Sequence, residues 1–211
     1  MSRPPVLRSQ MRVSLSYLTT TTSVSRLRRD ADLPPVGPHT MDPLGYAPAE
    51  GSLYLLEHFD DESGDQPRMH VLHVRGPHVG RMVVVDGGAT GERDFEDRLA
   101  ALRARLVELR PLPRDRFALS TRVVRRRALR LYADEMPIRK YTLRIHVRAL
   151  GNRIASIGAT TEVEAYLRPR VRLAEAWRVP GERFAVAVIS WVGIPFELGH
   201  DKQTALLVPC P

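Results

Sequence analysis

Residues 140–150 constrain the fold more than any other segment, because their polarity alternates at every second position. The odd positions hold Tyr141, Leu143, Ile145, Val147 and Ala149. The even positions hold Lys140, Thr142, Arg144, His146 and Arg148. Successive side chains of a strand point to opposite faces, so this pattern predicts a strand with one buried and one polar face. Such a strand needs neighbouring strands and a covering layer.

Shorter apolar runs predict further strands, and one segment predicts a helix. The strands are expected at 53–59, 69–74, 79–85, 117–124, 128–132, 154–166, 171–179 and 184–191, with a hairpin turn at Gly151-Asn152. Residues 92–110 carry apolar side chains at spacings of three and four, namely Phe95, Leu99, Leu102, Leu106 and Leu109. This spacing predicts an amphipathic helix that starts after an N-cap at Thr90 and stops before Pro111.

These elements predict an α+β fold that is mostly antiparallel β, as a sandwich or barrel. It has one main amphipathic helix at about 92–110 and an extended N-terminal arm. Three regions are expected along the chain. Residues 1–29 are a basic tail rich in Arg, Ser and Thr, residues 30–51 are a Pro/Gly-rich linker, and residues 52–211 are a single globular domain.

The tail has no acidic residue. Its arginines are Arg3, Arg8, Arg12, Arg26, Arg28 and Arg29. This composition is typical of a mitochondrial transit peptide, and the alternative is an arm that orders on a partner. The single cysteine, Cys210, excludes a disulfide framework and suits an intracellular reducing compartment. We therefore expect the mitochondrial matrix, with the cytoplasm as the alternative.

Several classes of site are not expected from the sequence. The longest apolar run, 184–196, is too short for a membrane span and contains Pro195. Four histidines cluster at His58, His70, His73 and His78, but His70 and His73 are three apart in a predicted strand and so fall on opposite faces. We predict no metal, no cofactor and no catalytic residue.

One glycine-rich turn, Asp86–Gly91 (DGGATG), follows a predicted strand and leads into the predicted helix. Such a turn can cradle an anion. It resembles the Asp-Gly-Gly-Thr phosphate loop of the sugar-kinase and actin superfamily over residues 86–91, although the chain lacks the length and the duplicated domains of that family. A small enzyme or ligand-binding protein that uses this turn is one alternative function.

The net charge of +8 is unevenly distributed along the chain. Residues 1–29 carry +6, residues 42–100 carry −7 and residues 101–153 carry +11. The expected phosphate- or partner-contacting residues are Arg122, Arg125, Arg126, Arg127, Arg130, Lys140, Arg144 and Arg148. Tyr132 and His146 could stack on bases beside them. A GC-rich coding background is the alternative reason for 30 arginines against two lysines.

The sequence therefore predicts a non-catalytic structural subunit of a larger assembly. Its expected partners are other protein subunits and RNA, as in an organellar ribosome. A structural subunit without RNA, in a respiratory complex or a viral or phage particle, is the alternative. In either case residues 101–153, the basic middle of the chain, would contact the partner, whether that partner is RNA or an acidic protein surface.

Overall fold

A computed structural model describes residues 39–59, 67–86, 92–130, 137–151, 158–195 and 200–210. The elements are β1 (His39–Ala47), β2 (Ser52–Phe59), β3 (Arg68–His73), β4 (Met82–Asp86), α1 (Glu92–Arg103), β5 (Arg110–Pro111), the short 3-10 helix η1 (Arg114–Arg116), β6 (Phe117–Leu129), β7 (Ile138–Ala149), β8 (Ala159–Tyr166), β9 (Val171–Arg178), β10 (Phe184–Ile194) and β11 (His200–Pro209). The described part of the chain is thus mostly β with one α-helix, as predicted.

The strands form three antiparallel sheets with open edges. Their orders are β1-β2-β3-β4, β11-β10-β9-β5 and β6-β7-β8. No pairing among the described strands closes any of these sheets on itself, so the predicted barrel alternative is wrong. The sheets stack instead.

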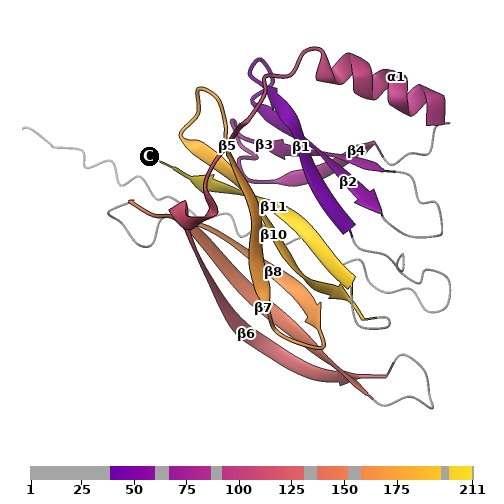
Figure 1. Ribbon diagram of the computed structural model, residues 1–211, viewed down its shortest axis with the longest axis vertical. Helices are drawn as coiled ribbons and strands as arrows, with labels where there is room; N and C mark the ends of the chain where they lie inside the picture. Colours follow the sequence, from indigo (N-terminus) through magenta and orange to yellow (C-terminus); the bar gives the residue numbers. More distant parts are fainter. Residues whose placement is uncertain are drawn as a thin grey trace, which may run out of the picture.

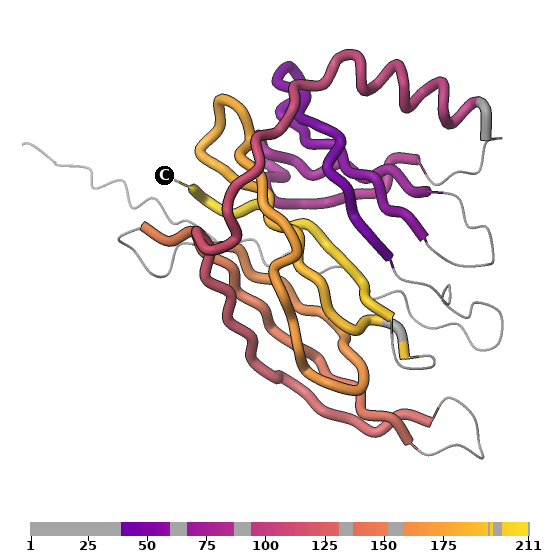
Figure 2. Tube along the Cα trace, in the orientation of Figure 1, coloured from indigo at the N-terminus to yellow at the C-terminus, as the bar shows by residue number. Residues whose placement is uncertain are grey.

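Four layers follow one another through the molecule (Figure 1). Helix α1 packs on the outer side of the β1–β4 sheet through Phe95, Leu99 and Leu102. The other side of that sheet packs on the β9–β11 sheet around Leu53 and Val186. The far side of the β9–β11 sheet packs on the β6–β8 sheet, and the tube trace shows the same order of layers (Figure 2).

The central position of β10 explains the longest apolar run of the sequence. Val186 and Val188 belong to the core shared with the β1–β4 sheet. Ala187 and Ile189 belong to the core shared with the β6–β8 sheet. A strand covered on both faces needs apolar residues at successive positions, which is why this run does not alternate. Within the described residues, no helix combines the length and apolarity needed to cross a bilayer.

The alternation in β7 is confirmed. Leu143, Ile145 and Val147 are fully buried, whereas Arg144 is exposed. The strands predicted at 117–124 and 128–132 are one strand, β6, which continues through a bulge between Val123 and Arg125. A bulge inserts an extra residue and shifts the alternation, which is why the two halves do not share one period.

Helix α1 ends at Arg103, earlier than the predicted Arg110. The chain leaves the helix because Val107 forms a β-bridge with Tyr46, with backbone N–H···O distances of 2.9 and 2.8 Å. Leu109 is still buried, now against the core between the first two sheets. Thr90, the predicted N-cap, lies outside the described residues.

The linker predicted at 30–51 differs from the structure from His39 onward. Residues 39–47 form β1, which pairs with β2 through a bulge between Pro43 and Gly45. An edge strand tolerates a proline because only one side of its backbone is paired. The domain therefore starts at or before His39 rather than near Ser52.

Candidate functional site

The basic residues predicted to contact phosphate meet on the paired strands β6 and β7. Arg122 lies opposite Arg144, and Arg127 lies opposite Lys140. Arg125 lies opposite Thr142. Residues that face each other across an antiparallel pair share a face, so Arg122, Arg125 and Arg127 form a row, the outer row, beside the polar positions of β7.

Two basic residues of β7 in this surface are neutralised by β8. Arg144 pairs with Glu162, with 2.8 Å between Nε and Oε1. Lys140 Nζ lies 2.7 Å from Glu164 Oε2. Burial alone lowers the pKa of Lys140, but interactions with Glu164 and Tyr166, of which the hydrogen bond to Glu164 is the largest, outweigh burial and raise that pKa above its ordinary value. The positive charge that is not paired with an acid therefore lies on the edge strand β6 rather than on the central strand β7.

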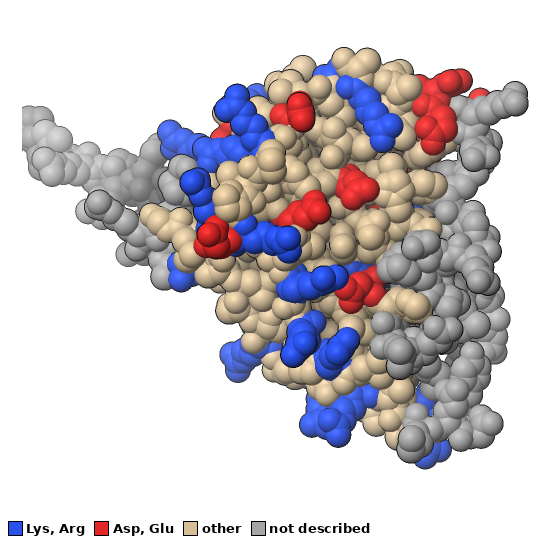
Figure 3. Space-filling model, viewed as in Figure 1, with Lys and Arg blue, Asp and Glu red and all other residues tan. Residues whose placement is uncertain are grey.

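The edge strand β6 keeps its charge. Residues 120–128 are all exposed. None of the ion pairs among the described residues includes Arg122, Arg125, Arg126 or Arg127. The prediction that these residues all share one surface is wrong for Arg126. This residue faces Tyr141 on the opposite side of the sheet, and its Cζ lies 6.0 Å from the centre of the Tyr141 ring. Basic side chains gather over this lower part of the molecule (Figure 3).

The other residues that were predicted to contact RNA or a partner do not belong to the outer row. Arg130 is exposed just beyond β6, and Arg148 is half-buried opposite Ala118. His146 is half-buried, and its Nε2 lies 2.5 Å from where a Cβ on Gly158 would be. That close approach packs the His146 ring against the chain rather than offering it as a stacking surface. Tyr132 and the six tail arginines lie outside the described residues.

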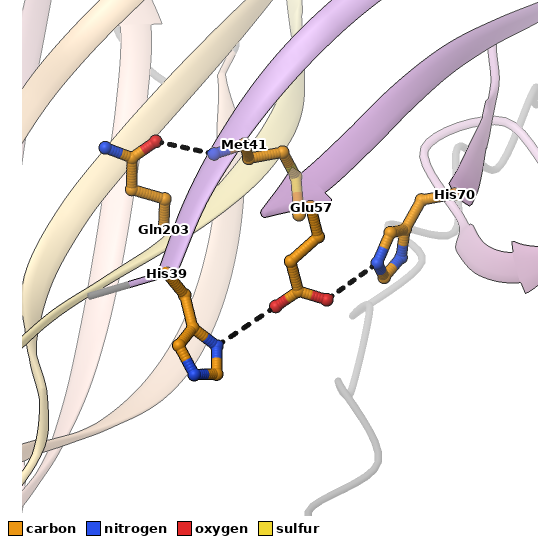
Figure 4. A network of polar contacts seen from close by, with 5 residues as sticks. All are labelled: His39, Met41, Glu57, His70 and Gln203. Atoms are coloured by element: carbon orange, nitrogen blue, oxygen red, sulfur yellow. Dashed lines mark hydrogen bonds and ion pairs between the residues drawn. The ribbon is translucent and has the colours of Figure 1, made fainter. Parts of the chain in front are cut away.

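A buried polar network lies at one end of the interface between the first two sheets (Figure 4). The carboxylate of Glu57 on β2 lies between two histidines. Its Oε1 is 3.3 Å from His39 Nδ1 on β1, and its Oε2 is 2.8 Å from His70 Nε2 on β3. Nearby, the backbone N–H of Met41 donates to Gln203 Oε1 at 2.9 Å, which ties β1 to β11.

Glu57 is an ionised buried carboxylate. Burial raises its pKa, but hydrogen bonds and charges from His39 and His70 outweigh burial and lower the pKa to about 2. Within the described part of the chain, Nε2 of His39 is buried without a hydrogen-bond partner. The alternation Leu53, Leu55, Glu57 could have revealed this carboxylate from the sequence, because it places Glu57 on the buried face of β2.

The predicted histidine cluster does not assemble into one site. His70 joins Glu57, whereas His58 pairs with Asp42 at 3.2 Å. The rings of His73 and His78 lie 5.9 Å apart. Among the described residues, no group of three His, Cys, Asp or Glu side chains could hold a metal ion.

Asp86, the described residue of the glycine-rich turn, borders a pocket of about 460 Å³ between α1 and the β1–β4 sheet. Met69 and Leu102 line it, together with Arg98. Arg98 donates to Asp86 Oδ2 from Nε and Nη2 at 3.0 and 2.8 Å, so the two charges at the rim satisfy each other. Residues 87–91 of the turn lie outside the described residues.

Comparisons with protein families, with curated proteins and with solved structures find no match to this chain.

Proposed function

We propose that the protein is a non-catalytic subunit of a larger assembly that contacts RNA phosphates through the outer row of β6. The observation that carries this proposal is the exposed outer row itself, Arg122, Arg125 and Arg127, which forms no ion pair with a described acid. The basic residues opposite two of them, Arg144 and Lys140, are paired with Glu162 and Glu164 of β8. The charge that is left for a polyanion therefore lies on β6, where it can replace the counterions of phosphates.

The geometry of β6 supports the proposal further. The outer row extends along a strand whose residues rise about 3.3 Å each, so its charges follow a line. The row is exposed on a strand held by the whole length of β7. A rigid line of guanidinium groups is suited to a regularly charged backbone, because arginine can donate two parallel hydrogen bonds to one phosphate.

The buried network supports a structural role for the other end of the molecule. Both oxygens of Glu57 are used by histidines, and Met41 is tied to Gln203. These contacts join β1 to β2 and β11, and they join β2 to β3. In this proposal, the contacts hold β1, the strand that follows the basic tail, in a fixed position.

The test is RNA binding by the full chain with the outer row reversed, as Arg122→Glu, Arg125→Glu and Arg127→Glu together. The matched control reverses three exposed arginines elsewhere, Arg81, Arg103 and Arg114, so that both proteins have the same net charge. We expect the outer-row variant to lose affinity and to show a smaller dependence on salt, while the control stays near wild type. Equal losses in the two variants would contradict the proposal.

A subunit that contacts an acidic protein rather than RNA is the second candidate. The observation that favours it is the position of β6 at the edge of its sheet, where one side of its backbone is unpaired by any described strand. An acidic extended segment could pair with such an edge. Gentle purification from the natural source with and without ribonuclease separates the two, since an assembly that survives ribonuclease intact favours the protein partner.

A further inference from the structure

Three segments that are distant in the sequence meet at one corner of the β6–β8 sheet. Arg127 at the end of β6 lies opposite Lys140 near the start of β7. Lys140 in turn lies opposite Tyr166, the last residue of β8. The next residue, Leu167, donates its backbone N–H to the carbonyl of Arg139 at 2.8 Å. We call this meeting point the basic corner.

Arginines occupy both faces of the sheet at the basic corner. Arg125 and Arg127 belong to the outer row. Arg126 faces Tyr141 and Arg139 faces Ala128, so both lie on the opposite face, and we call them the inner pair. That face is packed on the β9–β11 sheet elsewhere, yet both residues of the inner pair are exposed.

The chain leaves β8 at this corner through a strained turn. Leu167 has a φ of +62°, a conformation that leucine rarely adopts. The N–H of Arg168 donates to the carbonyl of Tyr166 at 2.6 Å, closing a three-residue turn around Leu167. The turn is followed directly by an exposed arginine, Arg168, next to the residue whose N–H donates to the carbonyl of Arg139. Backbone strain of this kind concentrates at functional sites.

We infer that the basic corner inserts into a groove of double-helical nucleic acid, with the outer row and the inner pair contacting phosphates on the two walls. This inference rests on the proposed function and names the form of its ligand. A single strand has one line of phosphates, and the arginines on one face of the basic corner would be enough to bind it. Charges on both faces of a sheet edge instead match two lines of phosphates separated by a groove.

The shape of one groove agrees with this arrangement. The A-form minor groove of RNA is wide and shallow and is recognised by its shape and its phosphates. Arg126 and Arg139 come from the paired strands β6 and β7, and β6 is the edge strand of the three-stranded sheet, so both charged faces adjoin one edge.

The test compares duplex RNA with a single strand of the same sequence, using the full chain, wild type and Arg126→Gln/Arg139→Gln. The matched control, Arg81→Gln/Arg114→Gln, removes the same charge from exposed positions elsewhere. We expect wild type to prefer the duplex. The inner-pair variant should lose roughly tenfold in duplex affinity for each phosphate contact removed, and its salt slope should fall by about 0.9 per contact. Its affinity for the single strand should be unchanged.

Equal binding of duplex and single strand, or full duplex affinity in the inner-pair variant, would overturn the inference and leave the proposed function standing. Absence of RNA binding in any form would overturn both. The same measurement is also made with duplex DNA. Binding of both duplexes supports the inference and indicates that any double helix is recognised. Binding of duplex RNA alone also supports it and indicates that the A-form is recognised.

Discussion

Glu57 and His70 form a hydrogen bond on the buried side of the first sheet, with 2.8 Å between Oε2 and Nε2. His70 lies opposite Leu55 in the register of β2 and β3, so Glu57 is its diagonal neighbour on the same face. A buried carboxylate is stable as an ion only when such donors replace the water it has lost. The same bond gives a direct test of the folded state in acid.

Glu57 should make the protein sensitive to acid. Its pKa is about 2 in the fold against an ordinary 4.5, so its contribution to stability is present above pH 4.5 and is lost as the pH falls towards 2. The difference corresponds to about 3 kcal/mol. We expect urea unfolding to show that Glu57→Gln has a smaller decline in the free energy of unfolding over this range. Glu175→Gln, at an exposed position of β9, should decline like wild type.

The Tyr46 hydroxyl should contribute to stability up to high pH. It donates to Glu182 Oε1 at 2.5 Å, and burial, followed by the hydrogen bond and charge of Glu182, raises its pKa to about 12. Stability from this group is present below pH 10 and is lost as the pH rises towards 12. Tyr46→Phe should lower the free energy of unfolding by about 1 kcal/mol at neutral pH.

The matched control for Tyr46 is Tyr54→Phe, whose hydroxyl donates to Glu50 in an exposed position. Ultraviolet titration of tyrosinate should lose its most alkaline component in Tyr46→Phe. A titration curve that keeps this component would show that Tyr46 ionises like an ordinary tyrosine.

Replacing Arg122 with glutamate should weaken RNA binding with little effect on the stability of the sheet. The new carboxylate would face Arg144, but the guanidinium of Arg144 already pairs with Glu162 on β8. We expect the free energy of unfolding to change by no more than roughly 0.5 kcal/mol at low ionic strength, and by less in high salt because the pair is exposed. Thermal unfolding in low and high salt measures the change, with Arg81→Glu as the control. A stabilisation well above this value would mean that Arg122 and Arg144 repel each other in the fold despite Glu162.

Gly45 should be intolerant of any side chain. Its φ is +150°, and a Cβ would lie 2.8 Å from Leu106 Cβ and 3.0 Å from the carbonyl oxygen of Val107. Gly76 also has a positive φ, +81°, but its Cβ would meet nothing within 4 Å. Gly76→Ala therefore measures the backbone cost alone, about 1 kcal/mol. We expect Gly45→Ala to cost at least about 2 kcal/mol in urea unfolding, since it adds a clash to that cost. Equal costs would mean that the segment after α1 moves away freely.

Local periodicity was enough to predict much of the secondary structure. The alternation in β7 and the apolar runs of β2, β3 and β10 predicted strands that the structure contains. Strands with mixed patterns were missed. The first half of β11 is polar, and it is a strand because it pairs with β10 along its length. Likewise β1 contains Pro43, and its pairing with β2 was invisible in its own sequence.

Residues next to one another in the chain were sufficient to predict the strongly patterned strands, their apolar faces and the segments where positive charge is concentrated. Which strands pair, and in what register, depends on contacts that form only in the folded chain. That register put Arg122 opposite Arg144, moved Arg126 to the other face through the bulge in β6, and brought Arg139 and Arg168 to the same corner. It also placed Glu57 between His39 and His70. Register depends on contacts between distant segments and on one-residue shifts that exchange the two faces of a strand, and neither is encoded in local periodicity.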